Sequence, residues 1–181
     1  MPQCNLVQTS IIIDNCNPSV IWLNKPLGNT VRVMVFIEDR EGVYDAPIDK
    51  VWKLTQAHAT DCAGIHPGFK NIIIETVGEN DFIATWEEDI NGQIRKMKEK
   101  GTVFYPLGVA YEFIDGPFMG SKYFVYYVPQ EDDKTRVIMA GDFKSAPTDP
   151  TVDDEGKLRS IVLSAFEKVF DEDRAYLKNI E

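Results

Sequence analysis

FIATWEEDINGQIRKMKEKGTVF, residues 82–104, is the stretch that decides the fold of this 181-residue chain. Two runs with strand-like alternation flank Asn91-Gly92, the dipeptide that a two-residue type I′ hairpin turn prefers. Three lysines mark one face of the second run as the solvent side: Lys96, Lys98 and Lys100. The stretch therefore predicts an antiparallel hairpin with one face directed inward.

Similar strand-like runs occupy residues 31–37, 71–77, 109–114, 121–128 and 135–143. Short segments rich in Gly, Pro, Asn and Asp separate most of them. Many strands joined by hairpin-length turns indicate an antiparallel meander and not βαβ units. We therefore expect a curved antiparallel β-sheet of about seven strands in an α+β domain.

Two helices are predicted beside this sheet. The first follows Pro47, which suits the first helical position, and we expect it to end at Gly64 and Pro67. The second is a long closing helix over about 153–177. Its broad apolar stripe at i, i+3, i+4 spacing runs through Leu158, Ile161, Val162, Ala165, Phe166, Val169 and Phe170. Such a stripe needs a concave surface, which the curved sheet would supply.

Several stretches in this order resemble the START and pollen-allergen-like superfamily, also called SRPBCC. They are residues 45–52 (DAPIDKVW), 66–69 (HPGF), 107–118 (LGVAYEFIDGPF), the hairpin strand 122–128, 135–137 (TRV) and the closing helix. The subgroup most similar is that of polyketide cyclase/dehydrase and lipid-transport proteins. The resemblance covers residues 31–181 and implies a helix-grip fold, in which the sheet wraps around the C-terminal helix above an internal cavity. Residues 1–30 would form an N-terminal extension with short strands at 11–13 and 20–23.

The composition of the chain disfavours several classes of binding partner. The formal charge of −10 disfavours binding to nucleic acid and to anionic lipid headgroups. No apolar run is long enough for stable membrane insertion, and the first residues do not form a signal peptide. The three cysteines are widely spaced without a CxxC pair, which fits a reducing, cytoplasmic location. We expect a small hydrophobic ligand and no cofactor, and a homodimer stays open.

Strand periodicity selects residues that point into the predicted hollow. The candidate ligand-binding residues are Trp86, Glu88, Arg95, Met97, Tyr111, Tyr123, Tyr127, Met139 and Phe166. Aromatic walls with phenolic hydroxyls suit a small-molecule site, although each tyrosine alone can equally fill the core. Candidate acid/base groups are His66, Glu88, Arg95 and Glu99. The alternative for Arg95 and Glu99 is that this end of the strand projects beyond the core and is wet on both faces.

His58, Cys62 and His66 lie at i, i+4 and i+8 and form a second candidate set, for a metal ion. On one continuous helix they would share a face. Gly64 and Pro67 are expected to break the helix and separate them, so we predict no metal and keep these residues as the alternative. The acidic run Asp171-Glu172-Asp173 is interpreted as a solvated helix face.

Three functions stay open from the sequence. The first is a binding protein for a small hydrophobic, aromatic or lipid-like molecule. The second is a cyclase, dehydratase or hydrolase-like enzyme that uses the polar cavity residues, although no motif for a catalytic nucleophile or for phosphate binding is present. The third is an interaction or oligomerisation module built on the N-terminal extension.

Overall fold

A computed structural model describes residues 33–90, 92–145, 152 and 154–180 of the chain. The expected strands at 11–13 and 20–23 lie outside the described residues. The elements are β1 (Met34–Tyr44), α1 (Ile48–Ile65), β2 (Lys70–Thr76), β3 (Asp81–Ile90), β4 (Gln93–Phe104), β5 (Gly108–Asp115), β6 (Lys122–Gln130), β7 (Lys134–Lys144) and α2 (Glu155–Leu177). Their order is the predicted one, and most boundaries agree within a few residues; β1 is the exception, because it continues to Tyr44 whereas the predicted strand ends at residue 37.

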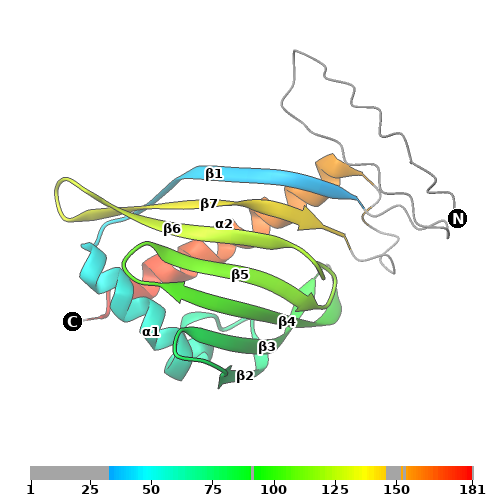
Figure 1. Cartoon of the computed structure of the whole chain (residues 1–181), viewed down its shortest axis with the longest axis horizontal. Helices are drawn as coiled ribbons and strands as arrows, with labels where there is room; N and C mark the ends of the chain where they lie inside the picture. The colour runs from blue at the N-terminus through cyan, green and yellow to red at the C-terminus, as the bar shows by residue number, and fades with distance from the viewer. Residues whose placement is uncertain (1–32, 91, 146–151, 153, 181) are drawn as a thin grey trace, which may run out of the picture.

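The strands form one seven-stranded antiparallel sheet in the order β1-β7-β6-β5-β4-β3-β2. Strands β2 to β7 are a meander, and β1 pairs with β7 on both sides of one irregularity. Both helices lie on the same face of this sheet, with α2 behind β1, β7 and β6 (Figure 1). The helix-grip fold predicted from the sequence is confirmed.

The core lies between the sheet and α2. Leu158 and Val162 of α2 are buried against inward side chains of β1, β3, β4 and β7, among them Ile37, Trp86 and Phe143. Packing of this kind, more than helix propensity, stabilises a helix of this length. A second buried cluster joins the start of α1 to the end of α2 through Val51, Leu54 and Leu177. The two clusters fix both helices over the concave face.

Two irregularities bend the sheet where the helices approach it. In β1, the register with β7 shifts between Asp39 and Gly42, and a Cβ on Gly42 would meet the Phe170 ring at 2.8 Å. In β5, one extra residue faces β4, because Lys98 pairs with Asp115 while Glu99 pairs with Phe113. A bulge of this type re-aims the neighbouring side chains. The β4–β5 bulge lies at Glu99, which belongs to the candidate site.

Candidate functional site

The end of α1 positions both histidines of the chain. The helix leaves helical geometry at Asp61 (φ −138°, ψ 34°) and ends at Ile65. His66 then caps it, donating its backbone N–H to the Cys62 carbonyl at 2.8 Å. The helix breaks here as predicted, but the prediction that this break separates His58 from His66 is wrong. The kink turns the chain back, so the two imidazoles meet: His58 Nε2 and His66 Nε2 are 3.0 Å apart.

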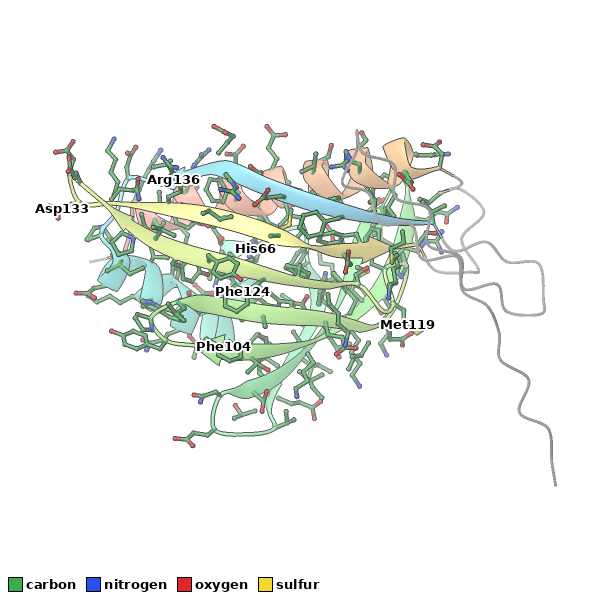
Figure 2. The ribbon with its side chains drawn as sticks, turned by 45° about the horizontal axis from the view of Figure 1, so that its top comes forward. His66, Phe104, Met119, Phe124, Asp133 and Arg136 are labelled. Atoms are coloured by element: carbon green, nitrogen blue, oxygen red, sulfur yellow. The ribbon has the colours of Figure 1, made fainter. Side chains whose placement is uncertain are left out.

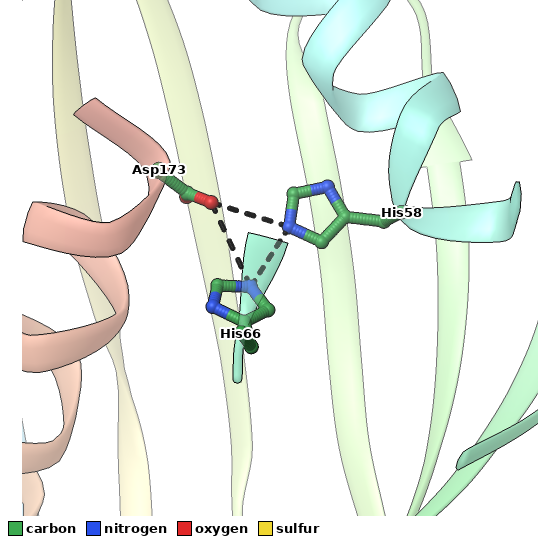
Figure 3. A group of neighbouring side chains, drawn as sticks. All are labelled: His58, His66 and Asp173. Carbon is green, nitrogen blue, oxygen red and sulfur yellow. Dashed lines mark hydrogen bonds and ion pairs between the residues drawn. The ribbon is translucent and has the colours of Figure 1, made fainter. Parts of the chain in front are cut away.

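The end of α2 supplies two carboxylates to the same place. Asp173 Oδ1 lies 3.2 Å from His58 Nε2 and 3.6 Å from His66 Nε2, and Glu172 Oε2 lies 2.8 Å from His66 Nδ1. Figure 3 shows the two rings and the Asp173 carboxylate directed at one another across the space between the helices. Asp173 is 8% exposed, so the interpretation of this acidic run as a solvated face is wrong for Asp173.

His58 and Asp173 each have a further hydrogen-bond partner that fixes the orientation of the side chain. His58 Nδ1 donates to the Leu54 carbonyl at 2.8 Å, one helical turn earlier. The hydroxyl of Tyr44, at the end of β1, donates to Asp173 Oδ2 at 2.8 Å. We call His58, His66 and Asp173 the His–His–Asp cluster. Its members come from α1, the α1–β2 turn and α2, which lie far apart in the sequence.

Charge in the His–His–Asp cluster is distributed unequally. Burial lowers the pKa of His58, but hydrogen bonding to Asp173 and its negative charge outweigh burial, so this pKa is raised overall. Burial dominates at His66, and its pKa is lowered. Burial and the Asp173 charge raise the pKa of Tyr44. The environment therefore favours positive charge on one ring and not on both.

A second polar group lies on the concave face of β4 and β6. Tyr123 donates its hydroxyl to Glu99 Oε2 at 3.1 Å. Burial raises the pKa of Glu99 to about 7, although this hydrogen bond and the charge of His58 act in the opposite direction. Burial also raises the pKa of Tyr127, to about 12, and burial raises the pKa of Tyr111. We call Glu99 and Tyr123 the Glu–Tyr pair.

Aromatic rings surround the Glu–Tyr pair. Tyr123 stacks on Tyr111 at 4.9 Å and makes an edge contact with Phe166 of α2 at 5.1 Å between ring centroids. Trp86, Met97 and Met139 are buried on the same face, each at most 7% exposed. The Glu–Tyr pair is thus a polar point in an otherwise apolar interior, as the inward-facing periodicity predicts.

The remaining sequence candidates are placed differently. Glu88 forms an ion pair with Lys168 of α2 at 3.0 Å, at the edge of this interior. Arg95 lies opposite Glu88 on the adjacent strand and is half-buried. Cys62 is not one of the three groups that converge in the cluster, and burial raises the pKa of its thiol to about 11. Their roles in binding or catalysis stay predictions.

One hollow of about 370 Å³ lies over β4, β5 and β6, and its lining includes Lys100, Ala110 and Phe124 together with Tyr111 and Tyr123. Ala110 pairs with Phe124 across β5 and β6, and both alternate along their strands with the inward-facing Tyr111 and Tyr123, so most of the lining belongs to the outer face. Figure 2 labels Phe124 on the sheet and His66, in the α1–β2 turn, near the middle of the molecule. An internal cavity under α2 stays a prediction.

Known structures share this architecture. The chain has the helix-grip fold of START and pollen-allergen-like proteins. The aromatase/cyclase Zhui from Streptomyces sp. R1128 superposes with a TM-score of 0.62 at 16% identity, over 80% of this chain and 91% of that one. A START superfamily protein from Mycobacterium smegmatis gives 0.58 at 14% identity, over 82% and 97%.

Norcoclaurine synthase from Thalictrum flavum, solved with dopamine and hydroxybenzaldehyde, gives a TM-score of 0.58 at 13% identity, over 90% of this chain and 99% of that one. No protein-family model and no curated protein sequence matches the chain. At these identities the likeness shows the fold alone. Neither helix in the described residues has the length and apolarity that a membrane-spanning helix needs.

Sequence reasoning missed Asp173, Glu172 and Tyr44. One signal was available: Asp173 continues the apolar stripe of α2, between Phe170 and Leu177, at helical spacing. An acidic residue on a buried stripe requires a partner, because a buried charge is costly unless it is paired. That signal would have placed Asp173 inside and prompted a search for a cationic or hydrogen-bonding neighbour.

Proposed function

We propose that the protein binds a small, largely aromatic or lipid-like molecule between the sheet and α2, and that the Glu–Tyr pair holds the polar end of that molecule. The observation that carries the proposal is the Glu99–Tyr123 hydrogen bond of 3.1 Å, located among inward-facing aromatic side chains. Few polar groups within an apolar wall are the usual composition of a small-molecule site.

Two further observations support this proposal. Glu99, Tyr111, Tyr123 and Tyr127 keep part of their surface accessible, whereas neighbouring Trp86 is buried. In addition, the indole Nε1–H of Trp86 is buried without a hydrogen-bond acceptor among the described residues. Buried donors are rarely left unpaired, and each case asks for an explanation. A ligand acceptor that reaches Trp86 would provide one.

Similar folds also bind small aromatic compounds, as the norcoclaurine synthase complex with dopamine and hydroxybenzaldehyde illustrates. An enzymatic role is the second candidate. A carboxyl group with a pKa of about 7 and a phenol in contact with it can accept and return a proton near neutral pH. Glu99 would then act as the general base, and Tyr123 would orient it, in a cyclase or dehydratase-like reaction.

Binding of 2-naphthol, 2-methoxynaphthalene and lauric acid, measured by calorimetry at pH 8, tests the proposal. The protein should bind 2-naphthol more tightly than 2-methoxynaphthalene, because only the naphthol hydroxyl can donate a hydrogen bond to Glu99. The Glu99→Gln variant, which offers a neutral acceptor, should lose about fivefold in affinity, since hydrogen bonds to charged groups are stronger by about 1 kcal/mol. Phe124→Ala, in the outer hollow, should leave the affinity unchanged. Loss in Phe124→Ala but not in Glu99→Gln would place binding outside and contradict the proposal.

A further inference from the structure

When both imidazoles are neutral, three hydrogen-bond acceptors meet in the His–His–Asp cluster without a donor between them. His58 Nδ1 faces a backbone carbonyl and His66 Nδ1 faces the Glu172 carboxylate, so both Nδ1 atoms carry the ring proton in neutral imidazoles. Both Nε2 atoms then present lone pairs, 3.0 Å apart. Asp173 Oδ1 is buried next to them and makes no hydrogen bond of acceptable geometry. Such an arrangement requires a cation.

The separations fit a metal ion. Distances of 3.0, 3.2 and 3.6 Å put the three atoms about 1.9 Å from a common point. An ion with bonds of about 2.0–2.1 Å to nitrogen and oxygen therefore fits just outside their plane. Tetrahedral ligands at that radius are about 3.3 Å apart, close to the mean of the observed values. Little movement of the side chains is needed.

We propose that His58 Nε2, His66 Nε2 and Asp173 Oδ1 bind a divalent first-row transition-metal ion, either Zn²⁺ or Fe²⁺. Imidazole ligands favour these ions over Mg²⁺ and Ca²⁺, which prefer oxygen. Two histidines and one carboxylate leave positions open, which is the arrangement of reactive metal sites and not of closed structural ones. The proposed ligand set keeps both histidines of the sequence-based alternative and replaces Cys62 with Asp173.

Surrounding contacts complete the expected second layer of a metal site. Each imidazole donates its other N–H to an oxygen, from Leu54 or Glu172, and Tyr44 donates to the free oxygen of Asp173. These partners fix the tautomer that directs Nε2 at a metal. An ordinary surface ion pair does not need these three additional hydrogen bonds. A metal ion can bind here whether or not a ligand occupies the Glu–Tyr pair.

A single proton is the competing cation. It can lie on one nitrogen and satisfy one neighbour, whereas a metal ion satisfies three acceptors together. The two cations differ in what they predict. If the cation is a proton, the protein binds no metal ion. If it is a metal ion, the protein binds one equivalent, and both imidazole rings coordinate it.

Metal content tests the proposal directly. The full chain is prepared without a histidine tag, stripped with chelator, and titrated with Zn²⁺, with Co²⁺ as an optical probe, and with Fe²⁺ under anaerobic conditions. We expect one ion per chain and a visible cobalt spectrum; the relative affinities distinguish zinc from iron. Absence of binding at micromolar concentrations of every ion would overturn the proposal.

Matched variants locate the ion. His66→Gln and Asp173→Asn should each lose at least a hundredfold in affinity, and Glu172→Gln about 10–100-fold, as for other outer partners. Asp171→Asn, an exposed neighbour on α2, and Cys62→Ser should bind like the wild type. Thermal melting confirms that each variant folds. Retention of the ion by both His66→Gln and Asp173→Asn would contradict the assignment.

The wild-type protein gives an independent measurement. His58 and His66 are the only histidines in the sequence, so ¹⁵N imidazole spectra contain two residues only. Addition of Zn²⁺ should shift both Nε2 resonances and leave both Nδ1 protonated. A shift at neither ring, or coordination through Nδ1, would overturn the proposal even if a variant failed to fold.

Discussion

The substitution Glu99→Gln removes the carboxyl group of the Glu–Tyr pair while keeping an oxygen that accepts from Tyr123. In the folded protein, burial raises the pKa of Glu99 from 4.5 to about 7. The folded state therefore holds a proton that the unfolded chain releases between those two values. Stability attributable to the neutral carboxyl is complete below about 4.5 and is lost as the pH rises through about 7.

A difference of between two and three pKa units corresponds to a loss on the order of 3 kcal/mol in the wild type by pH 8. The Glu99→Gln variant does not lose this stability, because its amide does not ionise. We expect the two proteins to have similar unfolding free energies near pH 5, and the variant to be more stable by up to about 3 kcal/mol at pH 8.

Urea unfolding followed by tryptophan fluorescence, at pH 5, 6, 7 and 8 with EDTA present, measures this difference. Tyr123→Phe removes the hydroxyl that favours ionised Glu99, so the loss of stability should move to higher pH. Glu112→Gln, on the outer face of β5, controls for the removal of one negative charge. A difference between Glu99→Gln and the wild type that does not change with pH would refute the reasoning.

Two further predictions concern stability. Tyr44→Phe leaves Asp173 Oδ2 without its buried donor and should cost about 1–3 kcal/mol in thermal or urea unfolding; a change within error would mean that the contact is not formed. Gly141→Ala places a Cβ 2.2 Å from the Lys122 carbonyl, where the β6 and β7 backbones approach, and should cost at least about 3 kcal/mol; full stability would contradict the pairing of these strands.

Most of the fold could be predicted from local signals. The alternation on either side of Asn91-Gly92 and the apolar stripe of α2 are short-range patterns, and the two strands and the helix that they predict appear at those residues of the described chain. The inward direction of Trp86 and Met97 follows from the same period of two. The pairing of β1 with β7 depends on contacts more than 90 residues apart, which no local pattern encodes.

The His–His–Asp cluster could not be predicted, because its geometry comes from long-range packing. Gly64 and Pro67 correctly indicated a break in the first helix, but the direction that the chain takes after a break is not encoded locally. Asp173 meets the histidines only because α2 crosses the concave face at one register, set by Leu158, Val162 and Leu177. Sequence spacing alone therefore suggested Cys62 in its place.

Methionine methyl NMR tests the central claim, that a small molecule enters between the sheet and α2. Met97 and Met139 are buried on the inward face, and Met34 and Met119 are exposed; Figure 2 labels Met119 at one end of the molecule. With ¹³C-methyl methionine, 2-naphthol or lauric acid should shift Met97 and Met139 and leave Met34 and Met119 in place. Shifts confined to Met34 and Met119, or no shift with any of the three probe compounds at millimolar concentration, would contradict the account.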